Sequence, residues 1–266
     1  MDFKVKTFCS DIALYMEKIA PINLACEWDN PGLLIGNLGN EVKNVLVCLD
    51  VTREVVEFAI TNKVDLILSH HPFIFKGIKS INTSDAKGEL IHKIIKNNIS
   101  IYAAHTNFDF AQNGLNNLLA KKLDLHYSNS LFMGNNKECT VGKIGELFNS
   151  LKFSDFVQNV KKQLNLGNVR VVGNMNKHIK NVAVFCGAFD ESLLKLVKNR
   201  VDCIVTGDLK HHVALEIQQE GLNAIDAGHF GTEHIFVGHV VELLQKDFPN
   251  INVFMKDDEK DSLIYM

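Results

Sequence analysis

No stretch of this sequence approaches the roughly 18 uninterrupted apolar residues that a membrane-spanning helix needs. Residues 1–21 carry charges throughout their apolar stretch, which predicts an amphipathic helix over about 7–19 and not a signal peptide. The six cysteines are scattered singly with no CxxC pair, and several lie in apolar runs, where a reduced thiol behaves as a small hydrophobe. We therefore expect a cytoplasmic protein without a membrane partner.

The sequence also lacks an excess of charge of either sign. Its 28 lysines and arginines nearly balance 31 aspartates and glutamates, for a net charge of -3, so the charge gives no reason to expect nucleic acid as a partner. Neither a P-loop nor a glycine-rich nucleotide fingerprint is present, so the small-molecule substrate stays unidentified. What the chain does have is 266 residues with 46% apolar content, enough for one large or two modest domains.

Apolar runs of strand length alternate with helical patterns in both halves of the chain. In the first half the strands are expected at 43–50, 65–71 and 99–105, and the helices at 52–63, 87–97 and 113–123. In the second half the strands are expected at 180–187, 202–208 and 222–228, and the helices at 190–199, 210–219 and 232–247. The pattern predicts an α/β fold made of two βαβαβα units.

Polar residues repeat between the two units, which indicates an internal duplication. At an offset of 137, the Lys-Asn-Val of 43–45 aligns with 180–182, and the Val-Asp of 64–65 aligns with 201–202. Two unrelated βαβ units of equal length would also share apolar strands, but the matched polar residues favour duplication. We expect a two-lobed subunit with units at 1–130 and 131–266, because the intervening 139–179 (strand, helix, strand) is too short for an inserted central domain.

In open α/β units the ligand site collects at the carboxyl ends of the strands, and the unusual polar residues of this sequence lie there. They are His70 and His71, His105 and Asp109, Asp208 with His211 and His212, and His229 with Glu233. Imidazole and carboxylate without a nearby cysteine are ligands of Zn, Fe, Mn or Co in an open, hydrolytic type of site. The donors suffice for two divalent ions roughly 3.5–4 Å apart, with Glu233 as the expected bridge.

Each candidate also has an ordinary structural role as its alternative. His70 and His71 precede Pro72, and a pair held by a proline-fixed turn favours ligation. Glu233 could instead be favoured by the helix dipole, and Asp109 could cap the helix at 113.

Four further residues are candidates for supporting or catalytic roles beside the metal. His105 is expected to orient another ligand or to bind loosely. Asp208 aligns with His71 at the offset of 137, while His211 and His212 begin a helix, where a surface role is equally compatible. The residues expected to line the substrate cavity are Trp28, Asp29 and Asn107.

With these residues the chain resembles the Nif-three-like dinuclear-metal family, whose bacterial members are often labelled GTP cyclohydrolase 1 type 2 homologues. The segments that carry the resemblance are residues 28–33 (WDNPGL), 69–72 (SHHP), 105–109 (HTNFD), 206–212 (TGDLKHH) and 226–233 (DAGHFGTE). The resemblance implies two transition-metal ions on His70, His71, Asp109, His229 and Glu233. It also implies a toroidal homohexamer arranged as a trimer of dimers; longer members insert a domain that this chain lacks.

These features support three functional hypotheses. In a metal-dependent hydrolase, the paired ions would activate a bridging water against a nucleotide or another phosphate-containing molecule, and His105 or His212 would move protons. The alternative is a non-enzymatic ring that stores, delivers or senses metal, or binds a partner. A ring that encircles DNA ranks third because of the net charge.

Overall fold

The structure is a computed structural model that describes residues 6–133, 139–256 and 258–264. The chain divides into two compact units: Met1–Phe108 with Phe236–Glu259, and Asp109–Ile235 with Lys260–Met266. The division departs from the predicted 1–130 and 131–266, because the last strand pairs with a strand of the first unit instead of extending the second. No helix in the described segments is long and apolar enough to cross a membrane.

The first unit is built on a five-stranded sheet with the order β13-β4-β5-β6-β2. Its strands are β13 (Asn252–Met255), β4 (Asn44–Cys48), β5 (Leu66–Ser69), β6 (Ser100–Ala103) and β2 (Gly32–Ile35). All neighbours pair in parallel except β2, which is antiparallel to β6. The predicted strands are thus confirmed as β4, β5 and β6, while β2 and β13 at the edges were not predicted.

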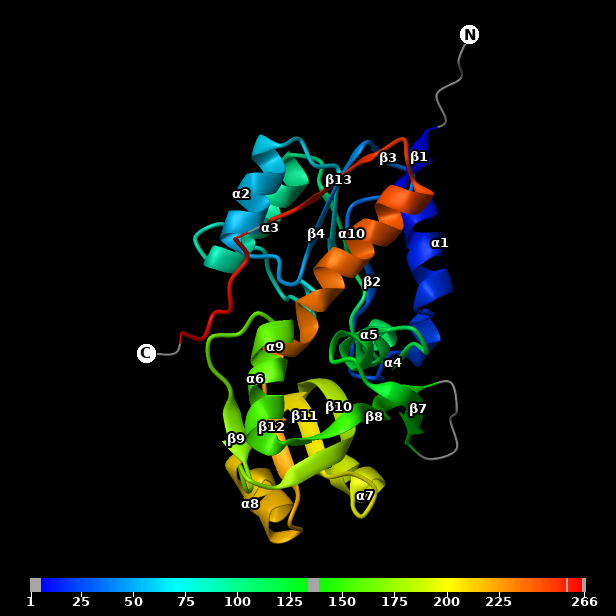
Figure 1. Cartoon of the computed structure of the whole chain (residues 1–266). Helices are drawn as coiled ribbons and strands as arrows, with labels where there is room; N and C mark the ends of the chain where they lie inside the picture. Colours follow the sequence, from blue (N-terminus) through cyan, green and yellow to red (C-terminus); the bar gives the residue numbers. More distant parts are fainter. Residues whose placement is uncertain (1–5, 134–138, 257, 265–266) are drawn as a thin grey trace. The chain divides into compact units, whose positions relative to one another are not determined.

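Helices cover both faces of this first sheet. They are α1 (Cys9–Ile19), α2 (Arg53–Thr61), α3 (Ala86–Lys96) and α10 (Ile235–Asp247). In Figure 1, α2 and α3 lie on one face, with α1 and α10 on the other. Because both faces are covered, the central strands are buried and apolar over most of their length, which is why the sequence predicts them. The small elements of this unit are β1 (Thr7–Phe8), η1 (Ile22–Leu24), β3 (Glu41–Val42) and the start of α4 (Thr106–Phe110).

The second unit is built on a six-stranded sheet with the order β7-β8-β10-β11-β12-β9. Its strands are β7 (His126–Phe132), β8 (Thr140–Lys152), β10 (His178–Ala188), β11 (Cys203–Gly207), β12 (Asn223–Asp226) and β9 (Arg170–Val172). The three predicted strands of the second half are confirmed as the parallel β10, β11 and β12. The segment 139–179 forms β8, a helix and β9, as predicted, and both of these strands pair antiparallel with the core.

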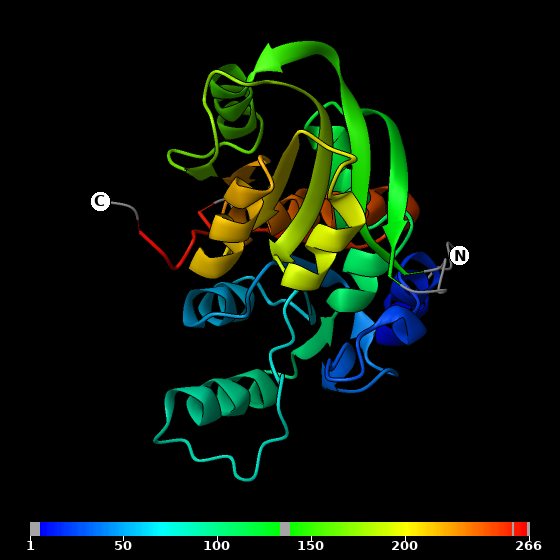
Figure 2. The same ribbon diagram turned by 90° about the horizontal axis from the view of Figure 1, so that it is seen from below.

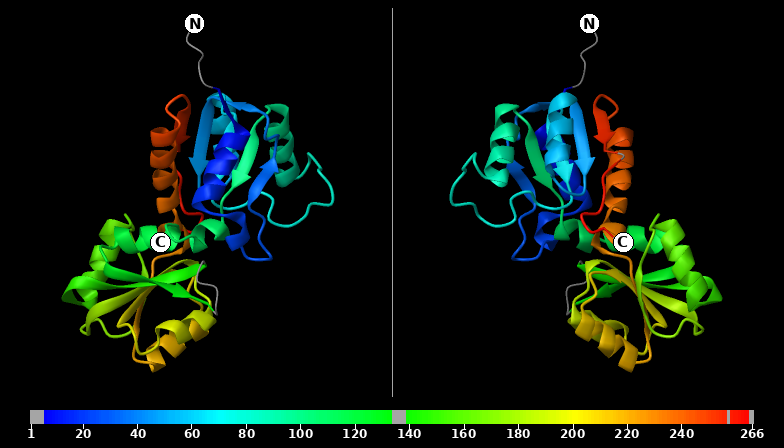
Figure 3. Two further views of the ribbon diagram at one scale, coloured as in Figure 1. Left: turned by 90° about the vertical axis from the view of Figure 1, so that its right-hand side faces the viewer. Right: turned by 90° about the vertical axis from the view of Figure 1, so that its left-hand side faces the viewer.

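Helices pack on both faces of the second sheet as well. They are α5 (Leu115–Lys122), α6 (Phe153–Gln163), α7 (Leu194–Val197), α8 (His211–Gln219) and α9 (His229–Glu233). Figure 3 shows α5 and α6 on one face of the sheet, with α7 and α8 on the other, in agreement with the two apolar clusters of this unit. The helix predicted at 190–199 is shorter than expected: a 3-10 turn, η2 (Glu191–Leu193), leads into α7. The helix predicted at 232–247 is divided into α9 and α10.

The repeated residues make the same contacts in both units, which supports the predicted duplication. The Asp65 carboxylate accepts hydrogen bonds from the backbone N–H groups of residues 43 and 44, at 2.8 and 2.9 Å. The Asp202 carboxylate accepts from residues 180 and 181, both at 2.9 Å. The shared polar residues therefore fix the start of the first strand of each parallel core.

Two isoleucines of the first unit, one buried and one exposed, allow a test of where its core lies. Ile67 of β5 has no exposed surface, whereas Ile95 of α3 is 53% exposed. We expect Ile67→Ala to lower the free energy of unfolding by about 2–5 kcal/mol, because it leaves a cavity in the core. Ile95→Ala should change it by no more than about 0.5 kcal/mol. Urea titration measures both, and equal losses would contradict this description of the core.

Candidate metal centre

Three histidines of the first unit come together at the carboxyl ends of β5 and β6. His70 and His71 follow β5, and His105 follows β6. Because adjacent parallel strands end at the same edge of a sheet, the three rings meet there: the ring centre of His70 lies 5.0 Å from that of His71 and 5.3 Å from that of His105. One potential ligand atom of each lies within 4.8 Å of the other two. The structure thus brings together the predicted candidates of this unit.

Each of these rings is oriented by a hydrogen bond from its Nδ1 to an oxygen atom 2.7–2.8 Å away. The pairs are His70 with the Ala104 carbonyl, His71 with the Asp50 carboxylate and His105 with the Asp29 carboxylate. An oxygen of this kind accepts, so Nδ1 carries the proton and the lone pair is on Nε2. This is the arrangement that metal-binding histidines have in proteins. Asp50 was not recognised in the sequence, although it stands at a strand end.

Two predicted cavity residues instead hold His105 in place. The Asp29 side chain has no exposed surface. Burial would raise the pKa of Asp29, but hydrogen bonds from His105 and Thr106 lower it to about 2, so Asp29 is ionised at neutral pH. Asn107 is buried and accepts the backbone N–H of His105 at 2.9 Å. Trp28 alone of the three cavity candidates is exposed, at 59%, with its ring 6.2 Å from that of His105.

In the second unit, His229 and Glu233 lie one turn apart on α9. The Nε2 atom of His229 is 3.1 Å from a carboxylate oxygen of Glu233, and its Nδ1 donates to Asp208 at 2.7 Å. Asp208 therefore orients His229 as Asp50 orients His71. Burial would lower the pKa of His229, but Glu233 and Asp208 together raise it to about 9.

Asp109 belongs to the same cluster of the second unit. One of its carboxylate oxygens lies within 4.8 Å of an oxygen of Glu233, which is only 2% exposed. Burial, together with the charges of Asp109 and Glu233, holds the pKa of the Cys186 thiol well above its usual range. Cys186 therefore stays protonated, and the donors of this cluster are carboxylate and imidazole.

Gly187 provides the space that Glu233 occupies, a role that was not predicted from the sequence. Its φ of +63° favours glycine, and a Cβ added there would lie 2.3 Å from a Glu233 carboxylate oxygen. Gly187 aligns with Asp50 at the offset of 137 that relates the two units. The alignment of the two units could therefore have pointed to both residues as strand-end positions beside the site.

His211 and His212 do not join these clusters. Both are exposed at the start of α8, and His212 pairs with the equally exposed Glu191 at 3.3 Å. Within the described segments, neither belongs to a group of donors close enough to share an ion. They are therefore not placed as metal ligands, and a supporting or catalytic role for them stays a prediction.

The two clusters fit divalent transition metals by their donor chemistry. They offer imidazole nitrogens with fixed orientation and partly or fully buried carboxylates, the ligands typical of Zn, Fe, Mn and Co. Burying such carboxylates is costly unless a cation or hydrogen-bond donor compensates. The first unit thus offers three histidines, and the second unit offers a histidine and two carboxylates, that could bind a metal ion.

Comparison with known proteins assigns the chain to a family. The family model described as Duf34/NIF3 (NGG1p interacting factor 3) matches residues 7–261. The chain belongs to the Duf34/NIF3 family. A Clostridium acetobutylicum protein named GTP cyclohydrolase 1 type 2 homolog is 35% identical over 235 residues, covering 88% of this chain and 86% of that protein. The crystal structure of a Bacillus cereus protein related to NIF3 superposes with a TM-score of 0.90 at 27% identity, covering 98% of this chain and 99% of that one.

Members of the Duf34/NIF3 family differ in length. The Bacillus subtilis protein named GTP cyclohydrolase 1 type 2 homolog is 27% identical over 360 aligned positions, covering 94% of this chain and 96% of that protein. An alignment longer than the 266 residues of this chain means that the relative has additional residues. The resemblance inferred from the sequence motifs is confirmed, and this chain is a short member.

The contact between Gly187 and Glu233 predicts a specific loss of metal. We expect Gly187→Ala to lower metal affinity about tenfold or more, since the new methyl group displaces a carboxylate ligand. Gly167→Ala is the matched control, because nothing lies within 4 Å of the added Cβ. Titration of the metal-depleted variants measures both affinities, and equal affinities would show that Gly187 does not position Glu233.

The raised pKa of His229 predicts that metal binding releases a proton. At pH 7 His229 is protonated in the metal-free protein, and a metal ion requires the neutral ring, so about one proton should leave. The same ion pairs stabilise the metal-free fold fully below pH 6.5, and this contribution is lost as the pH rises through about 9. Calorimetry in buffers of different ionisation enthalpy measures the release. Asp208→Asn should reduce it, and no release from the unaltered protein would contradict the assignment.

Proposed function

We propose that this protein binds two divalent transition-metal ions, drawn from Zn, Fe, Mn and Co, and hydrolyses a nucleotide or another phosphate-containing small molecule. The proposed ligands are His70, His71, Asp109, His229 and Glu233. The observation that carries the proposal is the fixed orientation of the imidazoles: His70, His71 and His229 each donate Nδ1–H to an oxygen of their own unit, which directs Nε2 to a ligand.

Glu233 is the proposed bridging ligand. Its carboxylate is nearly fully buried, close to both His229 and Asp109, and Gly187 leaves room for it. A pair of ions needs a carboxylate that contacts both, and glutamate has the longer side chain. When bound, the ions would lower the pKa of a water molecule. They would also polarise the group that the water attacks, which is either a phosphoryl group or a ring carbon of the substrate.

His105 is the proposed proton carrier. Asp29 receives its Nδ1–H at 2.7 Å, so Nε2 is the nitrogen that can accept a proton from water or substrate. The ionised Asp29 carboxylate would stabilise the imidazolium that results. His105 could alternatively be a loose ligand of an ion held by His70 and His71.

The second candidate function is a non-enzymatic protein that stores, delivers or senses metal, or serves as a scaffold for a partner. The donor clusters support this function as well as they support hydrolysis. The word cyclohydrolase occurs only in the names of relatives, and those names say homolog.

We also propose a homohexamer arranged as a trimer of dimers, which light scattering would test. A cytoplasmic location is proposed because the six cysteines are scattered singly along the sequence with no CxxC pair, a usage that suits a reducing compartment.

Metal content and turnover together test the proposed hydrolase. Elemental analysis of untagged protein should find about two ions per chain, and a screen of GTP, other nucleotides and simple phosphate esters should reveal hydrolysis. His71→Ala should abolish turnover, whereas His212→Ala, at an exposed histidine outside the clusters, should retain it. Two ions with no turnover on any of these compounds would favour the non-enzymatic function.

The bridging role of Glu233 predicts an order of metal loss. Glu233→Gln should leave fewer ions per chain than His105→Ala, because a bridge serves both ions while His105 serves one at most. Elemental analysis of the two variants measures this. If Glu233→Gln retained one full ion on the histidines of the first unit, the two clusters would be separate sites.

A further inference from the structure

Glu259, in the segment that follows β13, contacts the first unit beside the candidate metal centre. One of its carboxylate oxygens accepts the backbone N–H of Leu49 at 2.9 Å and that of Asp50 at 3.1 Å. Figure 1 and Figure 2 both show the red segment after β13 passing close to α2, the helix that follows Asp50 in the chain. These contacts join residues 210 and 209 positions apart, so no local motif of the sequence indicates them.

The contact lies where β4 loses its strand partner. β13 pairs with β4 only as far as Met255, which stands opposite Val47. The buried backbone beyond this point still needs hydrogen-bond acceptors, and Leu49 is only 1% exposed. Successive N–H groups of a regular strand point to opposite sides, whereas the chain bends after β4 and turns two of them toward one oxygen. Consecutive N–H groups of this kind form a concavity that accepts an anion, which here is the Glu259 carboxylate.

The two residues that Glu259 holds are also the two that hold His71. The Leu49 carbonyl accepts the backbone N–H of His71 at 3.0 Å, and the Asp50 carboxylate accepts Nδ1–H of its ring at 2.8 Å. The first hydrogen bond places the main chain of His71, and the second directs Nε2 toward a ligand. Without the Glu259 carboxylate, two N–H groups would lose their acceptor, and the bend would gain free energy by moving toward water. The orientation of the His71 ring therefore depends on Glu259.

The second unit supports the equivalent pair of positions in the same way. Cys186 and Gly187 align with this pair at the offset of 137. Their backbone N–H groups donate to Asn116 Oδ1 and Thr232 Oγ1, both at 3.1 Å. Gly187 lies against the proposed bridging carboxylate. In each unit, side-chain oxygens thus hold the two N–H groups that follow the first strand of the parallel core, beside a proposed ligand. In the first unit one carboxylate takes the place of the two neutral acceptors.

We propose that Glu259 is a positioning residue for the proposed metal ligand His71. Its carboxylate fixes Leu49 and Asp50, whose hydrogen bonds keep the imidazole in the direction that a metal ion requires. The inference rests on the proposed metal-binding function and deepens it, because occupancy of the site then depends on a side chain that is not a ligand. A glutamine at this position could accept the same two N–H groups through its amide oxygen, although more weakly than a carboxylate does.

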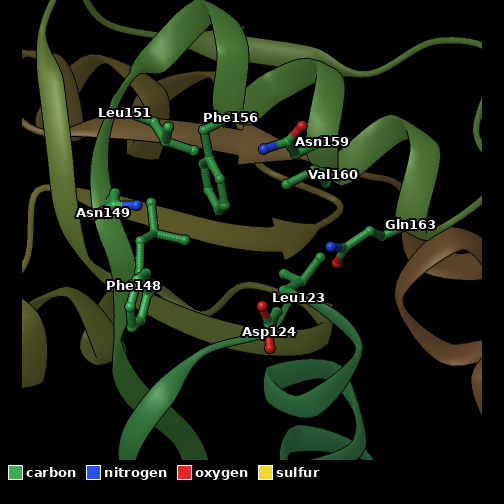
Figure 4. Close-up of a pocket in the computed structure, with 10 residues that line it drawn as sticks. Leu123, Asp124, Phe148, Asn149, Leu151, Phe156, Asn159, Val160 and Gln163 are labelled. Carbon is green, nitrogen blue, oxygen red and sulfur yellow. The ribbon is translucent and has the colours of Figure 1, made fainter.

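Titration of the metal-depleted full-length protein with Zn²⁺ tests the positioning role. Glu259→Ala should weaken Zn²⁺ binding about tenfold or more, whereas Glu259→Gln should stay within about threefold of the unaltered protein. Asp258→Ala removes a neighbouring carboxylate that is 72% exposed, and it should leave the affinity unchanged. Asn159→Ala is the distant control, at an exposed side chain that lines a cavity of the second unit (Figure 4). Unchanged affinity in Glu259→Ala, or an equal loss in Asp258→Ala, would overturn the inference.

A double variant separates positioning from a general loss of stability. Asp50→Ala removes the orientation of His71 directly, so adding Glu259→Ala to it should weaken Zn²⁺ binding by less than Glu259→Ala does alone. A residue that only stabilised the fold would lower the melting temperature without this dependence on Asp50. Losses of affinity that multiply fully in the double variant would therefore show that Glu259 does not act through Asp50.

The metal-free protein tests the inference separately from the proposed function. In NMR spectra, the Nδ1 proton of His71 should be protected from exchange with water in the unaltered protein and in Glu259→Gln. It should exchange at least about tenfold faster in Glu259→Ala, because the Asp50 acceptor is no longer held in place. Unchanged exchange in Glu259→Ala would overturn the inference even in a protein that binds Zn²⁺. Faster exchange in a protein that binds no Zn²⁺ would support the positioning role and refute the proposed metal centre.

Discussion

The hydrogen bond from an imidazole Nδ1 to an oxygen of the same unit is the constraint on which the candidate metal centre depends. Asp50, Asp29 and Asp208 each fix one histidine in this way at 2.7–2.8 Å. A histidine at a strand end could otherwise rotate, and either nitrogen could carry the proton. With Nδ1 committed to an oxygen, Nε2 has a fixed direction, and the histidine becomes a preorganised donor.

The proposed acidic ligands are also held in place by their neighbours. Glu233 is nearly fully buried beside Asp109, an arrangement that two carboxylates do not favour without a cation. The backbone of Gly187 makes room for it, since any side chain at that position would collide with the carboxylate. Membership in the Duf34/NIF3 family agrees with a metal-binding role. The family alone does not determine the reaction, which depends on the substrate that binds beside the metal ligands.

The parallel cores and the ligand candidates could be predicted from the sequence because both depend on short-range patterns. Strands covered on two faces are apolar throughout, and their carboxyl ends mark the ligand edge of an α/β sheet. The edge strands β2, β7 and β13 could not be predicted in this way, although the edge strand β9 was. β7 has the mixed sequence of a half-exposed strand, and β2 lies in a turn-rich segment.

The sequence by itself determined the duplicated α/β cores, the family and the histidine and acidic residues at the strand ends, because each follows from periodicity or a local motif. Only the tertiary structure decided that β13 returns to the first unit, that Asp29 holds His105, and that His211 and His212 face solvent. These outcomes depend on residues far apart in the chain, whose pairing arises from packing and hydrogen bonds that no local pattern encodes.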